Sequence, residues 1–172
     1  DDEGNNGIFN PNGKGDIKNF TDEYLPAYEL SKNNGYISFM TNNHDMPRMT
    51  HYFGMDAIKL AYAMIFTMPG VPFLSYGDEI GMKYQENLVS KEGGFSRTGS
   101  RTPMQWSADE KGGFSVHVPW LAMNPNYKEI NVREQEGRED SVLSYYKKLI
   151  ALRKSPEFKE TFVYGRVVPV YE

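Results

Sequence analysis

The sequence predicts an α/β fold built on a parallel sheet. Two short apolar segments, 36–41 and 71–76, suit buried strands, and an apolar segment between them, 57–68, suits a buried helix. A long loop and a final helix follow. This order is typical of parallel strands joined by crossover helices. Polar residues come directly after each strand, and in such folds functional side chains gather in the loops at the carboxyl ends of the strands.

The first expected element is a helix that begins after Asp16, a residue suited to the N-cap. Pro26 predicts a kink or an early end of this helix. A turn at 33–35 leads into the first strand. Asp56 is the expected N-cap of the second helix, and Pro69-Gly70 ends that helix. The helical assignment of the first element depends on apolar residues at helical spacing, which are Ile17, Phe20, Tyr24 and Tyr28.

The second half of the chain starts with a long loop from about Lys83 to Asp140. Ser141 is the expected N-cap of the last clear helix, which has one apolar and one basic side, and Pro156 ends it. The segment from Phe162 to Tyr171 has the pattern of a β-rich region.

Composition excludes several classes of function. The 172 residues suffice for one domain, or for a domain and part of another, and 39% of them are hydrophobic. A net charge of −4 argues against nucleic acid as a partner. The absence of cysteine excludes disulfides, thiol catalysis and cysteine-bound zinc. No apolar stretch is long enough for a membrane span, and no signal peptide is visible, which favours a cytoplasmic location over a secreted one.

The polar cluster Asn42, Asn43, His44 and Asp45 follows the first strand directly. A second polar pair, Asp78 and Glu79, follows the second strand. From the residues alone, the first cluster could form a functional site or an ordinary loop in which Asp45 caps the next turn.

Four motifs identify a resemblance that covers the chain from about Asp16 to Ser155. They are N-N-H-D-M-P-R, G-V-P-F-L-S-Y-G-D-E-I-G-M, G-S-R-T-P-M-Q-W-S and P-W-L-A-M-N-P-N-Y. In this order they resemble the α-amylase superfamily of glycoside hydrolases. R-T-P-M-Q-W followed by N-P-N-Y resembles its α-glucosidase and oligo-1,6-glucosidase branch. Met46 and Ser107 depart from the pattern of that branch and leave the detailed substrate open.

The resemblance implies the C-terminal part of a (β/α)₈ barrel, with strands 7 and 8 and their flanking helices, leading into a β-sandwich. Residues 1–157 would be the barrel portion, and residues 158–172 would begin the C-terminal β-domain. A whole barrel takes about 250 residues. The remainder of the barrel is therefore an expected partner of this chain.

The resemblance also implies a chemistry. Retaining glycosidases use a nucleophilic carboxylate and an acid/base carboxyl group. The family's G-x-R-x-D segment, which carries the nucleophile, is absent here, as is the acid/base Glu, so we expect this chain alone to be inactive. Asp45 would be the third catalytic carboxylate, which stabilises the transition state through sugar hydroxyls, and His44 would bind the same sugar.

Arg101 and Arg48 are the remaining expected substrate-binding residues. By resemblance Arg101 reaches the terminal glucose and pairs with an Asp from an early loop outside this chain, which makes the enzyme exo-acting; the alternative is a structural ion pair. Arg48 could shape the neighbouring subsite or be a solvated arginine. Three residues of the same motif are expected to be packing and loop anchors, namely Met104, Gln105 and Trp106.

We expect an α-glucosyl oligosaccharide as substrate and no cofactor. Calcium at the acidic opening, Asp1, Glu3 and Asn5, is an alternative, although an EF-hand would need Gly where Asn6 stands. The competing function is that of a non-catalytic amylase-like relative, a binding or partner module like the amylase-like ectodomains of amino-acid transporter heavy chains. An upstream G-x-R-x-D and a strand-end Glu would distinguish the two.

Overall fold

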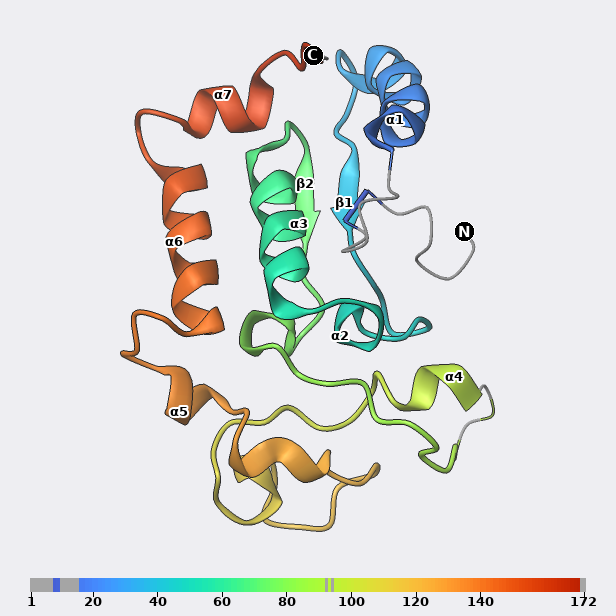
Figure 1. Cartoon of the computed structure of the whole chain (residues 1–172), viewed down its shortest axis with the longest axis vertical. Helices are drawn as coiled ribbons and strands as arrows, with labels where there is room; N and C mark the ends of the chain where they lie inside the picture. The colour runs from blue at the N-terminus through green and yellow to red at the C-terminus, as the bar shows by residue number, and fades with distance from the viewer. Residues whose placement is uncertain (1–7, 10–15, 92, 94, 171–172) are drawn as a thin grey trace.

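The computed structural model describes residues 8–9, 16–91, 93 and 95–170 (Figure 1). The first half of the chain contains α1 (Ile17–Ser31), β1 (Ser38–Met40), α2 (Met49–Tyr52), α3 (Met55–Thr67), β2 (Val71–Phe73) and η1 (Asp78–Ile80). The second half contains α4 (Phe95–Thr98), η2 (Glu110–Gly113), η3 (Pro125–Lys128), α5 (Val132–Gln135), α6 (Val142–Lys154) and α7 (Lys159–Tyr164). The described part of the long loop expected from Lys83 to Asp140 thus contains four short helices.

The two strands confirm the predicted parallel sheet. They form a two-stranded sheet in which Ser38 pairs with Val71 and Met40 pairs with Phe73. Because the strands are parallel, their carboxyl ends lie at one edge, and the loops that follow them meet there.

Most of the predicted helix boundaries hold, and two features differ from the prediction. Asp16 caps α1 by accepting the Lys18 backbone N–H at 2.8 Å, and Ser141 caps α6. Helix α6 ends at Lys154, before Pro156. Helix α1 continues past Pro26 to Ser31, and the N-cap of α3 is Gly54 rather than Asp56. Asp56 instead lies in the first turn, where its charge favours the positive end of the helix dipole.

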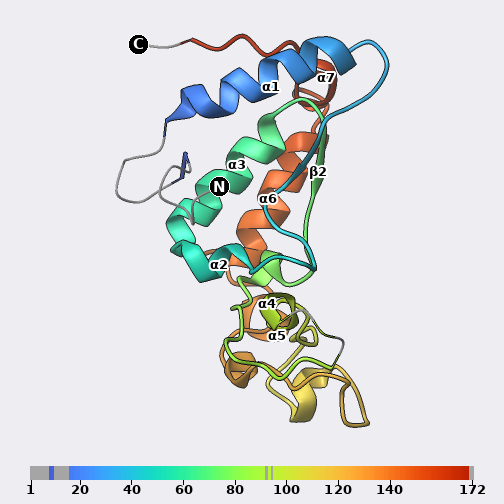
Figure 2. The same ribbon diagram turned by 90° about the vertical axis from the view of Figure 1, so that its right-hand side faces the viewer.

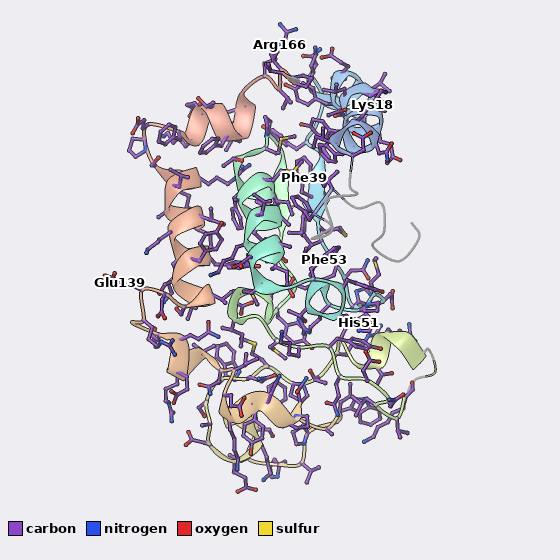
Figure 3. The ribbon with its side chains drawn as sticks, viewed as in Figure 1. Lys18, Phe39, His51, Phe53, Glu139 and Arg166 are labelled. Atoms are coloured by element: carbon purple, nitrogen blue, oxygen red, sulfur yellow. The ribbon has the colours of Figure 1, made fainter. Side chains whose placement is uncertain are left out.

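Helices α3 and α6 lie side by side and form the main core (Figures 1 and 2). The rings of Tyr62 and Tyr146 are centred 4.6 Å apart, and both side chains are fully buried. Phe39 of β1 packs against Ile65 of α3 and Tyr24 of α1, so α3 covers one face of the sheet (Figure 3).

The other face of the sheet is uncovered in the described chain. Met40 is 53% exposed, Val71 39% and Phe73 52%. The register places Met40 beside Phe73, and alternation along the strands puts all three side chains on one face. A sheet face left open in this way is typical of part of a larger sheet.

The tail differs from the expected β-rich region. Residues 162–164 belong to helix α7, and residues 165–170 form no strand. Phe158 and Phe162 explain the helix, because their rings stack at 5.4 Å and the Phe162 N–H donates to the Phe158 carbonyl. The β-rich assignment is therefore wrong for Phe162–Tyr164. The domain boundary at 158 stays a prediction.

Candidate active site

The loops after β1 and β2 surround a hollow of about 310 Å³. Residues from both loops line it, among them Asn42, His44, Arg48 and Tyr76, together with Ser100 from the later loop. The predicted residues at 42–48 therefore meet the segment at 76–79 at one edge of the sheet. Arg101 joins them from the loop between η1 and α6.

Asp45 lies among three nitrogen-bearing side chains. Its Oδ1 accepts hydrogen bonds from Nη2 of Arg101 at 2.9 Å and Nη1 of Arg97 at 3.2 Å. His44 Nε2 lies 3.2 Å from Oδ2 of the same carboxyl group. The Asp45 side chain is half exposed, so it can still accept hydrogen bonds from a ligand.

These neighbours keep Asp45 ionised. The hydrogen bond from Arg97 lowers the pKa of the Asp45 carboxyl below its usual value, and the charge of Arg101 acts in the same direction. At neutral pH the loop after β1 therefore presents a carboxylate. Such a group accepts hydroxyl hydrogen bonds strongly and stabilises positive charge nearby.

Arg101 contacts the backbone as well as the carboxylate of this loop. Its Nε donates to the His44 carbonyl at 2.8 Å. Its side chain is 23% exposed. In the described chain Arg101 thus pairs with Asp45, and the expected partner from an early loop is not among these residues.

Arg48 is buried, so the interpretation of a solvated arginine is wrong. Its guanidinium donates to the carbonyls of Tyr76 at 2.7 Å and Ser100 at 2.9 Å, and to Asp78 Oδ1 at 3.2 Å. The ring of Tyr76 lies 4.9 Å from the guanidinium carbon. Arg48 therefore ties the loop after β1 to the segment after β2 and to the loop that carries Arg101.

Asp78 is the centre of this buried network. Its Oδ2 accepts from Tyr62 Oη at 2.6 Å and from Asn42 Nδ2 at 2.9 Å. Burial raises the pKa of the Asp78 carboxyl, while the Tyr62 hydrogen bond and the Arg48 charge oppose that rise. Gly77 shapes the turn before it with φ +88°, where an added Cβ would lie 2.2 Å from Met82 Sδ.

Glu79 makes a structural contact, and the three expected anchors of the R-T-P-M-Q-W segment differ in burial. Glu79 Oε2 accepts the Gly77 N–H at 2.7 Å, which fits a structural role, and burial raises the pKa of this carboxyl. Met104 and Gln105 are buried anchors, as expected. Trp106 is 51% exposed and is not a packed anchor. It lines a second hollow of about 540 Å³ beside Arg101.

Sequence reasoning did not single out Arg97 or Asp78 as site residues. Arg97 stands four residues before Arg101 in a glycine-rich stretch, and no local pattern shows that both reach Asp45. Asp78 had one signal, its place directly after the second strand. Its partners come from residues 16 to 36 positions away, so only the fold reveals them.

The described residues contain no group of three or more potential metal-binding side chains of His, Cys, Asp or Glu. The acidic opening considered for calcium, Asp1, Glu3 and Asn5, lies outside the described residues. No helix within the described ranges is long and apolar enough to cross a membrane.

Comparison with known families and proteins gives concordant matches. The model of the α-amylase catalytic domain matches residues 10–163. The oligo-1,6-glucosidase of Bacillus cereus is 34% identical over 165 residues, covering 76% of this chain and 29% of that protein. The oligo-1,6-glucosidase of Halalkalibacterium halodurans is 36% identical, covering 84% of this chain and 32% of that protein. The chain thus spans about a third of the length of these relatives.

Solved structures agree with the sequence matches. A mutant isomaltulose synthase from Erwinia rhapontici NX5, bound to its natural substrate sucrose, superposes with a TM-score of 0.72 at 30% identity. The match covers 87% of this chain and 33% of that protein. A trehalulose synthase mutant in complex with Tris superposes with a TM-score of 0.69 at 28% identity, over 81% of this chain and 32% of that protein.

Proposed function

The chain belongs to the α-amylase catalytic-domain family, in its α-glucosidase branch, and from that premise we propose that the complete protein is a retaining, exo-acting glycoside hydrolase. Its substrates would be α-glucosyl oligosaccharides. The chain would form the last part of a (β/α)₈ barrel over residues 1–157, and residues 158–172 would begin a following β-domain.

The observation that carries the proposal is the placement of Asp45 at the carboxyl ends of two parallel strands. Its ionised carboxylate lies beside His44 and is held by two arginines. In the proposed reaction Asp45 accepts hydrogen bonds from hydroxyls of the bound glucose. These bonds strengthen as positive charge develops on the sugar ring, which lowers the barrier. His44, whose side chain is 71% exposed, donates to the same sugar.

The two carboxyl groups that make and break bonds would come from the remainder of the barrel. The chain contains no G-x-R-x-D segment for the nucleophile. The exposed face of β1 and β2, opposite α3, supports this division, since side chains of the other strands would cover it inside a closed barrel and those strands would pair with the open edges. We therefore expect activity only in the complete protein.

Arg101 would set the substrate length. It bonds to both the backbone of His44 and the carboxylate of Asp45, which places its guanidinium at the Asp45 end of the site. In the complete protein it would close the pocket behind one terminal glucose. The relatives include oligo-1,6-glucosidases and an enzyme whose natural substrate is sucrose, so they do not single out one glycosidic linkage. Loops outside this chain would determine which linkage the complete protein cleaves.

Product analysis on maltoheptaose tests the proposal. An exo-acting enzyme should release glucose as the dominant early product and should act on maltose or isomaltose far better than on starch. A spread of internal fragments would refute the closed pocket. A complete protein that releases no sugar from any of these substrates would support the non-catalytic alternative instead.

A further inference from the structure

We infer that Asp78 is a positioning residue that holds the 42–48 loop, and with it Asp45, in its working geometry. The inference rests on the proposed function, because it assigns Asp78 a part in the same reaction. The Asp78 side chain is buried and is assigned no contact with the sugar. Its effect runs through the loop that carries Asp45.

The Asp78 carboxylate is buried and fully engaged with partners. Its side chain is 6% exposed, and it receives three side-chain hydrogen bonds, from Tyr62 on α3, Asn42 after β1 and Arg48 before α2. A buried carboxylate with this many donors is held firmly, and each donor is held by it. The network therefore joins three separate segments of the chain through one carboxylate.

Two of those donors are the two ends of one loop. Asn42 stands immediately before Asn43, His44 and Asp45, and Arg48 closes the loop on the other side. The Asp78 carboxylate lies 36 residues after Asn42 and 30 residues after Arg48, and it thus fixes both ends of the loop. Between them the loop adds a short internal bond, in which the Asp45 N–H donates to Asn43 Oδ1 at 2.8 Å.

The same network also reaches the segment that carries Arg101, the residue that pairs with Asp45. Arg48 Nη2 donates to the Ser100 carbonyl, one residue before Arg101. Ser100 Oγ donates to the Met46 carbonyl at 2.5 Å, one residue after Asp45. Asp78 therefore fixes Arg48, and Arg48 fixes the loop and the Arg101 segment relative to each other.

Loss of the Asp78 charge should loosen this arrangement without removing any group that contacts sugar. In Asp78→Asn the Arg48 guanidinium stays buried without its counter-charge, and one amide must face the donors of Tyr62, Asn42 and Arg48. A donor facing a donor is unfavourable, so the loop should shift. A shift of about 1 Å at a reacting group can cost about 10²-fold in rate.

The test is steady-state kinetics of Asp78→Asn in the complete protein with an aryl α-glucoside. Rates are expressed per active site, counted by labelling with a covalent glycosidase inactivator. We expect kcat to fall about 10²-fold while KM changes far less, because the binding groups remain. The affinity for a cationic iminosugar, which mimics the charged transition state, should fall in parallel with kcat.

Two further variants keep the test decisive. Asn42→Ala removes only one tie between Asp78 and the loop, leaves the Arg48 pair intact, and should lower kcat about tenfold. It decides the matter if Asp78→Asn does not fold. Asp109→Asn is the matched control, since Asp109 is an exposed partner of Arg133 far along the chain, and its kcat should be unchanged.

The inference is overturned if both Asp78→Asn and Asn42→Ala keep wild-type kcat per active site. This includes the case in which total activity falls only because the inactivator labels a smaller fraction of the protein. Asp45→Asn separates this failure from a failure of the proposed function. If Asp45→Asn is inactive while Asp78→Asn is fully active, only the positioning role is wrong. If Asp45→Asn is fully active, the proposed function itself is wrong.

Discussion

Asp45 is the residue on which the proposed function depends, and its surroundings explain how an exposed carboxyl group can be held in place. Arg97 and Arg101 approach the same oxygen, Oδ1, and leave Oδ2 to His44. Exposed ion pairs contribute little to folding stability. Here the two arginines therefore act on the orientation and the charge state of Asp45 rather than on folding stability.

Replacing Arg97 by Ala should raise the pKa of Asp45 toward its ordinary value, because the Arg97 hydrogen bond is the main cause of the lowered pKa. A lowered pKa in the folded state means that this pairing stabilises the protein above the unfolded pKa, about 3.9, and is lost as pH falls through the folded value. A carbon-13 NMR titration of labelled aspartate measures the shift. An Asp45 resonance that titrates identically in both proteins would contradict it.

Replacing Arg101 by Ala should raise KM and lower kcat on short α-glucosides. A charge-assisted hydrogen bond to a sugar in a closed pocket contributes about 1.5–3 kcal/mol. Arg133→Ala is the matched control, because Arg133 forms an exposed pair with Asp109 at 2.7 Å. If Arg101→Ala costs less than about 1 kcal/mol in kcat/KM, Arg101 is only a surface ion pair.

Among the helices and strands, the sequence predicted the features that depend on neighbouring residues. It missed the features that depend on contacts between residues far apart in the chain. Caps at Asp16 and Ser141 and both strands followed from residues within a few positions of each other. The start of α3 two residues earlier than expected depends on packing, and the helix at 159–164 depends on the Phe158–Phe162 stack. The Asp78 network could not be predicted, since it joins four separate segments.

Arg153 illustrates such a distant contact between elements. From α6 it donates to the carbonyls of Phe66 and Met68 at the end of α3, at 2.8 and 3.0 Å, and to that of Gly70 before β2. Its side chain is buried, and the last carbonyls of a helix have no partners within the helix.

We expect Arg153→Met to destabilise the complete protein by about 2–4 kcal/mol, because three acceptors lose a charged donor. The neighbouring Lys154 is exposed, and Lys154→Met should change stability by less than about 0.5 kcal/mol. Thermal unfolding followed by circular dichroism compares the two. Equal melting temperatures would show that Arg153 does not hold α3 and β2 together.

On the scale of the whole molecule, the described chain is an incomplete α/β layer. Helix α3 covers one face of a two-stranded sheet, α6 packs against α3, and the opposite face of the sheet carries exposed Met40, Val71 and Phe73. Family membership followed from motifs in the sequence. No motif of this chain predicted the linkage that the proposed enzyme would cleave.

The isolated chain should therefore behave as a part rather than as a domain. We expect the 172 residues expressed alone to bind a hydrophobic dye such as ANS and to unfold without a sharp transition, because apolar faces and strand edges stay open. The complete protein, which serves as the control, should bind little dye. A sharp, dye-free transition of the isolated chain would contradict this expectation.

Asp45→Asn in the complete protein tests the central claim most directly. The change keeps the shape of the side chain but removes the charge that accepts hydrogen bonds from the sugar in the transition state. With an aryl α-glucoside, kcat should fall about 10²-fold or more, while the melting temperature stays close to that of the wild type, because Asp45 is exposed. A variant that keeps near wild-type turnover would contradict the assignment of Asp45, and with it the proposed site.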